Sequence, residues 1–129
     1  MAKILIVDDY EQIRAVARRV LAKDGHEIWD VPDGVQALDL LEIITFDLVL
    51  TDVFMAAVDG MDLLARIQQR GYRVPVIVMS GGGLASREEV LARAKECGAV
   101  ASLAKPFTPD QLRETVEQSL KPSAPSSPA

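Results

Sequence analysis

Two kinds of hydrophobic pattern alternate along the chain. Short runs that are almost continuously apolar and rich in Ile, Val and Leu occupy residues 3–7, 46–51 and 74–79. Such runs are typical of strands that are covered on both faces, as in a parallel sheet. Weaker runs of the same kind occupy residues 27–31 and 100–104. The pattern therefore predicts five strands.

Between the strands, apolar residues recur at the spacing of one helix face. The stripe after the first strand falls at positions i, i+3, i+4, i+7 and i+8, as Ile13, Val16, Ala17, Val20 and Leu21. The last stripe repeats every four residues, as Leu112, Val116 and Leu120. Both stripes predict amphipathic helices with one side against the sheet.

Residues that favour helix ends lie at the borders of the predicted helices. The stretches 86–89 and 108–111 have the pattern of a capping box, and the stretch 33–36 is a looser version of it. Three glycines follow helical stretches, where a left-handed residue would end the helix: Gly25, Gly71 and Gly98. Strand and helix thus alternate five times, which predicts an α/β fold with a doubly wound, five-stranded parallel sheet.

Composition and charge narrow the class of protein. The chain has 129 residues, the usual size of one domain. Its 14 basic and 19 acidic residues give a net charge of −5, so we expect no direct contact with nucleic acid. A single cysteine excludes an internal disulfide. Acidic residues interrupt the first apolar run, and no run approaches the roughly 18 residues of a spanning helix. We therefore expect a cytoplasmic protein without a membrane partner.

The residues that end the predicted strands carry the candidate chemistry, because sites in a doubly wound sheet lie beyond the carboxyl ends of the strands. The first strand ends in Asp8 and Asp9, the third in Asp52, the fourth in Ser80 and the fifth in Lys105. Clustered carboxylates favour a hard cation such as Mg²⁺, and an aspartate can accept a phosphoryl group as a mixed anhydride. The set fits a phospho-aspartate site in which the cation, the ammonium and the hydroxyl contact phosphoryl oxygens.

Five short motifs follow one another in the chain. They are Ile-Leu-Ile-Val-Asp-Asp ending at Asp9, Asp-Leu-Val-Leu-Thr-Asp ending at Asp52, Met55 with Asp59-Gly60, Pro-Val-Ile-Val-Met-Ser ending at Ser80, and Lys-Pro-Phe beginning at Lys105. In this order they resemble the receiver domains of two-component response regulators, from Lys3 to about Leu120. The resemblance implies the flavodoxin-like fold of the bacterial chemotaxis regulator, with strand order 2-1-3-4-5.

The resemblance also implies the roles of the acidic residues. Asp52 would be the phosphoacceptor, and Asp8, Asp9 and Asp52, with the backbone carbonyl of Phe54, would hold Mg²⁺ or, in its place, Mn²⁺. The phosphoryl donor would be a sensor histidine kinase or a histidine phosphotransfer protein. The output would be a changed surface for an unknown downstream protein, without turnover of a substrate.

Three further positions concern the phosphoryl site and its switching. Ser80 stands where the family has its switching Thr or Ser, and Lys105 stands where it has its lysine, with a cis peptide bond expected before Pro106. Ser102 departs from the family, which usually has Tyr or Phe there. We infer that switching relies on ordering of the glycine-rich loop at residues 81–85 more than on an aromatic side chain.

Each of these residues also has an ordinary structural interpretation. Asp9 could cap the first helix, since Gln12 follows three residues later. Asp52 could be a loop acid, Ser80 a turn residue and Lys105 a solvated lysine. The joint occurrence of the residues favours the functional interpretation.

Two other classes of protein remain open. A phosphate-independent binding module would keep the fold and lose the switch, and Ser102 favours this class. A Mg²⁺-dependent phosphatase of the haloacid dehalogenase kind is disfavoured, because that family has Asp-x-Asp after its first strand and an additional cap segment.

The end of the chain has a different composition. Residues 121–129 are rich in Pro and Ser and predict a disordered tail or the stub of a linker after a receiver domain at residues 1–120. We expect a stand-alone protein, and a receiver cut from a longer chain is the alternative.

Overall fold

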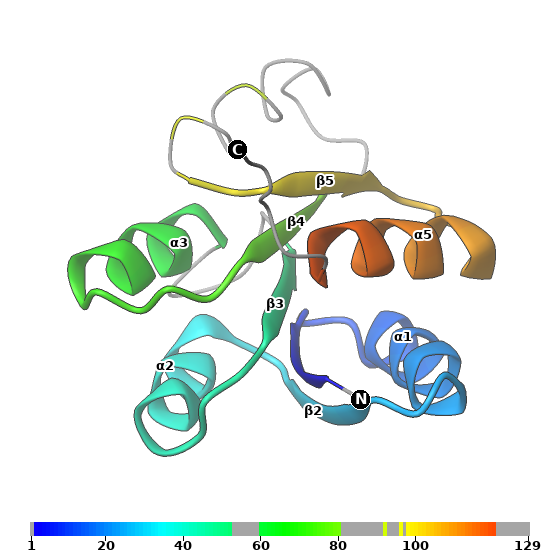
Figure 1. The fold of residues 1–129 in the computed structure, drawn as a ribbon, viewed down its shortest axis with the longest axis horizontal. Helices are drawn as coiled ribbons and strands as arrows, with labels where there is room; N and C mark the ends of the chain where they lie inside the picture. Colours follow the sequence, from blue (N-terminus) through cyan, green and yellow to red (C-terminus); the bar gives the residue numbers. More distant parts are fainter. Residues whose placement is uncertain (1, 53–59, 81–91, 93–95, 97, 121–129) are drawn as a thin grey trace, which may run out of the picture.

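A computed structural model describes residues 2–52, 60–80, 92, 96 and 98–120. Its centre is a five-stranded parallel sheet in the order β2-β1-β3-β4-β5 (Figure 1). The strands are β1 (Lys3–Val7), β2 (Glu27–Val31), β3 (Leu48–Asp52), β4 (Val76–Ser80) and β5 (Ala101–Ala104). The helices are α1 (Glu11–Lys23), α2 (Gly34–Ile43), α3 (Gly60–Gln69) and α5 (Pro109–Leu120). The predicted fold and strand order are confirmed, whereas the capping box at residues 86–89 lies outside the described residues.

Sequence and structure agree on β1 and β2 and differ at the ends of the other strands. β3 begins at Leu48 and β4 at Val76, each two residues after the start of its apolar run, and β5 begins one residue later than predicted. Phe46 is buried although it precedes β3, so the apolar run marks the start of burial and not the start of the strand. β3 and β4 also extend one residue further, to Asp52 and Ser80, since the ladder uses backbone groups and accepts polar side chains.

Side chains of the strands alternate between two apolar layers. Leu5 and Val7 of β1 lie in the layer that α2 and α3 complete, whereas Ile4 and Ile6 lie in the layer of α1 and α5. Figure 1 shows α2 and α3 on one side of the sheet and α1 and α5 on the other. Each fully buried Leu or Ile side chain contributes about 1.5–3 kcal/mol relative to an exposed one. The faces of the sheet are thus covered by helices, and its strand ends remain for chemistry.

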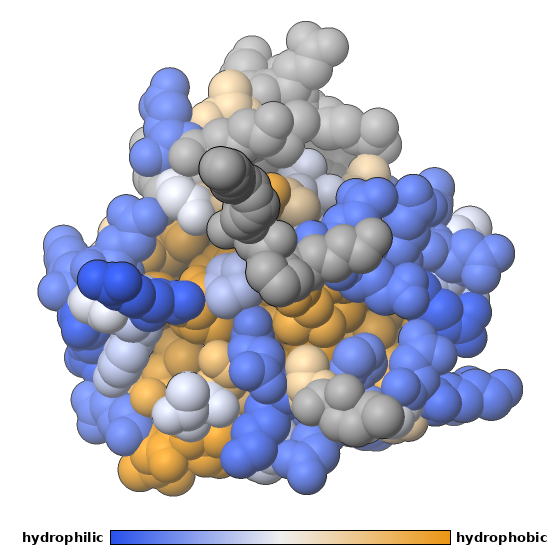
Figure 2. Space-filling view, viewed as in Figure 1, coloured by the Kyte–Doolittle hydropathy of each residue, from blue (hydrophilic) through white to orange (hydrophobic). Residues whose placement is uncertain are grey.

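The face that Figure 2 shows is hydrophilic at much of its rim, with apolar areas over α2 and in its middle. Val35 and Ile43 of α2 are exposed although both are large and apolar. The apolar composition of α2 therefore exceeds what its contact with the sheet uses. Among the described residues, no helix is long and apolar enough to cross a membrane.

The predicted helix ends are confirmed where they are described. The Asp33 carboxylate accepts a hydrogen bond from the Gln36 N–H at 2.8 Å, just before α2. Gly25 and Gly71 follow α1 and α3 with the positive φ angles that end helices, 90° and 76°. Gly98 also has a positive φ, 101°, but most of the helical stretch predicted before it lies outside the described residues.

Val16 does not lie on the buried face of α1, although the predicted apolar stripe includes it. Ala17, Val20 and Leu21 are buried and Ile13 is half-buried, but Val16 is 43% exposed. A surface helix buries a stripe about 100° wide, and Val16 lies at the margin of the arc that the other four residues define.

A capping box joins α5 to the segment that carries Lys105. The Thr108 N–H donates to Gln111 Oε1 at 2.9 Å, and the Gln111 N–H donates to Thr108 Oγ1 at 3.1 Å. Both bonds satisfy backbone groups that the first helical turn leaves free. Leu112 and Val116 then anchor α5 in the core.

We predict that Thr108→Ala lowers the free energy of unfolding by about 1 kcal/mol, because it removes one bond of the box. Urea denaturation measures this change. Thr108→Ser keeps the hydroxyl and is the matched control, which we expect to stay near the wild type. Equal destabilisation by the two substitutions would contradict a capping role.

Candidate functional site

The predicted site residues meet at one edge of the sheet, where the parallel strands end. Asp8 directly follows β1, Asp52 is the last residue of β3, Ser80 is the last residue of β4 and Lys105 directly follows β5. The chain passes from β1 outward to β2 and then returns to β3 on the other side of β1. Such a reversal leaves a crevice between the neighbouring strand ends, which is the usual place of a site in this type of sheet.

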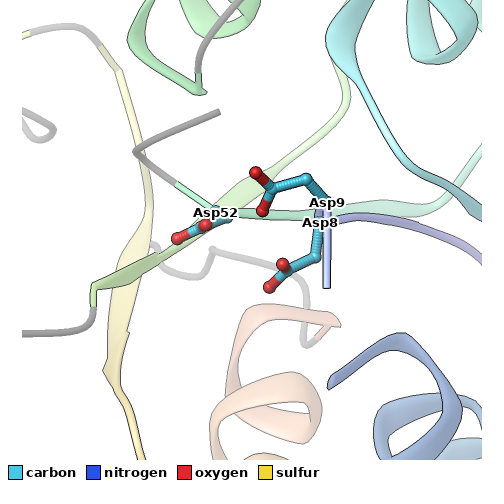
Figure 3. A group of neighbouring side chains, drawn as sticks. All are labelled: Asp8, Asp9 and Asp52. Atoms are coloured by element: carbon cyan, nitrogen blue, oxygen red, sulfur yellow. The ribbon is translucent and has the colours of Figure 1, made fainter. Parts of the chain in front are cut away.

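Three carboxylates form the acidic part of the site. Asp8, Asp9 and Asp52 each offer an oxygen, and these oxygens lie within 4.8 Å of one another. Figure 3 shows the three side chains together at the ends of β1 and β3. Asp8 and Asp52 are buried, whereas Asp9 is exposed. With Lys105 as the ammonium in contact with them, ionised carboxylates leave two negative charges uncompensated, so the cluster can hold a divalent cation.

Lys105 is the basic part of the site. Its Nζ lies 2.6 Å from Asp8 Oδ2 and 3.3 Å from Asp52 Oδ1, and its side chain is 13% exposed. The interpretation as a solvated lysine is therefore wrong. Its backbone N–H donates to the Ser80 carbonyl at 2.8 Å, which ties the end of β5 to the end of β4. The Lys105–Pro106 peptide bond is cis, as the resemblance implied.

Asp9 does not cap α1. The residue at the N-cap position is Tyr10, and it makes no side-chain capping bond. The Asp8 carboxylate instead accepts the N–H of Tyr10 itself, through Oδ1 at 2.9 Å. The exposed Asp9 carboxylate therefore remains beside Asp8 and Asp52 as a potential ligand.

Burial dominates the electrostatics of Asp52. The residue is 4% exposed, so the interpretation as a loop acid is wrong. Loss of water raises the pKa of Asp52 from its usual 3.8 to about 6. The positive charge of Lys105 opposes this shift of the pKa, and the negative charges of Asp8 and Asp9 add to it.

The predicted switch residues lie apart from each other. Ser80 is half-buried at the end of β4 and pairs with Ala104 of β5. Ser102 pairs with Val78, further from the strand ends, and lines a hollow of about 350 Å³ together with residues of α5. Phe54 and the loop at residues 81–85 lie outside the described residues.

Two contact residues were missed by sequence reasoning. The Tyr10 ring centroid lies 5.8 Å from Lys105 Nζ, within the range of a cation–π contact. Arg14 donates to the Asp8 carbonyl through Nη1 at 2.7 Å. Arg14 had a signal in the sequence, because a cation near the start of a helix opposes the helix dipole and indicates a specific partner.

Comparisons with known proteins agree with this geometry. The response regulator receiver domain family matches residues 4–117. Sporulation initiation phosphotransferase F of Bacillus subtilis (strain 168) is 36% identical over 118 residues, which cover 92% of this chain and 93% of that protein. The sensor histidine kinase RcsC of Salmonella typhi is also 36% identical, over 88% of this chain but only 12% of the kinase. The receiver domain of NtrX from Brucella abortus has a similar structure, with a TM-score of 0.85 and 32% identity over 93% of this chain and 99% of that one.

The chain therefore belongs to the family of response regulator receiver domains. Membership connects it with two-component signalling, and its acidic site is consistent with phosphorylation-dependent switching.

We predict that Asp52→Asn stabilises the metal-free protein at pH 7.5 by up to about 3 kcal/mol. The pKa of Asp52 is about 6 when folded and 3.8 in its usual range, so stability from its protonation is present below about pH 4 and is lost as the pH rises through 6. The gain should therefore be much smaller at pH 4.5, where the folded wild type carries the proton.

Thermal or urea unfolding in the presence of a chelator measures this difference. Asp39→Asn, which neutralises an exposed residue of α2, is the matched control. An equal gain at the two pH values would contradict a buried, destabilising charge at Asp52.

Proposed function

We propose that this receiver accepts a phosphoryl group on Asp52 from a phosphohistidine and thereby changes its surface for a protein target. The observation that carries the proposal is the buried Asp52 carboxylate at the strand end, 3.3 Å from Lys105 and beside two further carboxylates. The donor is a sensor histidine kinase or a histidine phosphotransfer protein. The net charge of −5 supports protein partners over nucleic acid, and we place the protein in the cytoplasm.

The donor set of the acidic cluster fits Mg²⁺, with Mn²⁺ as a substitute. Its three carboxylate groups are hard oxygen ligands, and their excess negative charge favours a divalent cation. Asp8, Asp9 and Asp52 would hold the ion, and the resemblance adds the Phe54 carbonyl. When bound, the ion supplies positive charge for the phosphoryl oxygens during transfer.

The chain's own residues would then act as follows. A carboxylate oxygen of Asp52 attacks phosphorus, the phosphorus–nitrogen bond of the phosphohistidine breaks, and the electron pair stays on the imidazole nitrogen. Lys105, already 3.3 Å from Asp52 Oδ1, pairs with a phosphoryl oxygen. The Ser80 hydroxyl, at the neighbouring strand end, donates to another. The chain is a switch that carries one phosphoryl group, and it is not a turnover enzyme.

Lys105 also connects the site to the ends of β4 and β5, so a change at Asp52 can alter the surface there. Its ammonium bridges Asp8 and Asp52, and its backbone N–H binds the Ser80 carbonyl. A phosphoryl group on Asp52 competes for that ammonium and thus changes the forces at the ends of β4 and β5. With Ser102 in place of an aromatic residue, we propose that the loop after β4 conveys the change.

A phosphate-independent binding module is the second candidate. The observation that favours it is Ser102, a small residue beside a hollow at β5 and α5, at the position where the resemblance implies an aromatic side chain. We further propose that residues 1–120 form the receiver unit and that residues 121–129 are a tail or linker.

We predict that the wild type gains one phosphoryl group when it is incubated with acetyl phosphate and Mg²⁺, whereas Asp52→Asn gains none. Intact mass spectrometry measures the gain, and a chelator should abolish it. A wild type that gains no phosphoryl group and binds no beryllofluoride would favour the phosphate-independent module.

We also predict that Mg²⁺ raises the melting temperature of the wild type at pH 7.5. A concentration ten times the dissociation constant stabilises the folded state by about 1.4 kcal/mol, because the ion binds the folded chain alone. The shift should be lost in the double variant Asp8→Asn/Asp9→Asn and kept in Asp39→Asn. A shift of equal size in the double variant would place the ion elsewhere.

A further inference from the structure

We propose that Arg14 is a positioning residue that holds the acidic turn after β1 in the geometry required for cation binding. This inference rests on the proposed function of the same site. Arg14 lies in the first half of α1, and its side chain is 15% exposed. Its Nη1 donates to the Asp8 carbonyl at 2.7 Å, and its Nε donates to Asp30 Oδ2 at 3.0 Å. The guanidinium thus joins the turn to β2.

Two contacts tie the backbone of Asp8 to β2, one at its N–H and one at its carbonyl. Its N–H donates directly to the Val31 carbonyl at 3.2 Å, and its carbonyl is connected to Asp30 through Arg14. The two peptide planes that flank Asp8 are therefore held, which fixes the direction in which its side chain leaves the chain. Asp9 follows in the same turn, so its carboxylate depends on the same anchor.

The side chain of Asp8 is held as well. Its Oδ1 accepts the Tyr10 N–H at 2.9 Å, and its Oδ2 contacts Lys105 Nζ at 2.6 Å. Asp8 is fully buried, so a shift of its backbone would break bonds that water cannot replace. Arg14 supplies the one bond in this set that reaches Asp8 from a side chain of α1.

Arg14 suits this role because its guanidinium is planar and has donors in fixed directions. A lysine has the same charge but a single nitrogen, and it cannot join the carbonyl and the carboxylate with the same geometry. Asp30 compensates the positive charge of Arg14, which would otherwise repel a cation bound nearby. Groups that orient metal ligands in this way typically change metal affinity by about 10- to 100-fold when removed.

Arg18 provides a matched control in the same helix. Its Nη1 lies 2.8 Å from Asp30 Oδ1, so it shares the carboxylate with Arg14. Its side chain is 51% exposed, and its Nη1 donates to Asp30 and not to Asp8. The two arginines therefore differ in the contact that the proposal invokes.

The direction in which Mg²⁺ affinity changes on replacing Arg14 distinguishes a positioning role from an effect of its charge alone. Removing a positive charge near a cation site strengthens cation binding by Coulomb's law. Loss of positioning weakens it. Arg14→Gln should therefore raise the Mg²⁺ dissociation constant about tenfold or more, against the electrostatic trend. Arg18→Gln should leave it unchanged or lower it slightly.

The experiment compares the full-length wild type with Arg14→Gln, Arg14→Lys and Arg18→Gln. Calorimetry gives the Mg²⁺ dissociation constant, and labelling by acetyl phosphate at varied Mg²⁺ gives the apparent KM for Mg²⁺ and the maximal rate. In Arg14→Gln the KM should rise with the dissociation constant, while the maximal rate changes less than twofold. Amide exchange of Tyr10 in the metal-free protein should be faster in Arg14→Gln and unchanged in Arg18→Gln.

Arg14→Lys keeps the charge and decides the question if Arg14→Gln does not fold. It should weaken Mg²⁺ binding several-fold although no charge is lost. A folded Arg14→Lys or Arg14→Gln with wild-type affinity, even at reduced thermal stability, would overturn the positioning role. A wild type that binds no Mg²⁺ would overturn the proposed function together with this inference. A wild type that binds Mg²⁺ no more tightly than the folded Arg14 variants would overturn this inference alone, so the two failures can be distinguished.

Discussion

Negative charge held out of water at one edge of the sheet is the constraint on which the site depends. Asp8 is fully buried and Asp52 nearly so, and both contact the ammonium of Lys105. Burying ionised carboxylates is costly unless opposite charge and hydrogen bonds compensate, and here one ammonium faces an acidic cluster. Burial raises the pKa of Asp52, and the excess negative charge of the three carboxylates over Lys105 makes the cluster able to hold a cation. The buried charge that opposes folding is thus the same charge that the proposed phosphoryl acceptance uses.

The sheet makes this arrangement possible because it fixes where the strands end. β1 and β3 are neighbours in register, and both are covered by helices on both faces. The apolar side chains of the strands leave little freedom for the backbone, so the residues at their carboxyl ends are placed with the precision of the core. The bonds around Asp8 extend this order by one residue beyond the strand, through Val31 and Arg14. Lys105 closes the site from β5, whose end is tied to Ser80.

The candidate site was largely predictable from strand ends, but individual contacts were not. Hydrophobic runs locate the ends of parallel strands, and polar residues just after them must share one edge. The helix-cap interpretation of Asp9 was wrong because capping depends on the φ and ψ angles at the start of α1, where Tyr10 occupies the N-cap position. The assignment of Val16 to the helix face against the sheet was wrong, because periodicity gives the centre of a buried face more reliably than its margin. Arg14 and Tyr10 were missed because Arg14 contacts the turn after β1 and Tyr10 contacts Lys105, which follows β5.

The sequence by itself determined the α/β class, the order of strands and helices, and the set of side chains available for chemistry. Hydrophobic periodicity and helix-end residues are local properties, so they can be read without knowledge of what lies opposite. Tertiary structure alone decided that Asp52 is buried, that Lys105 contacts both it and Asp8, and that Arg14 donates to the Asp8 carbonyl. These features depend on distances between residues as many as 97 positions apart, as in the Lys105–Asp8 bond, and on loss of water around them. Both arise when the strands are brought together, because desolvation and ion pairing are properties of neighbours in space.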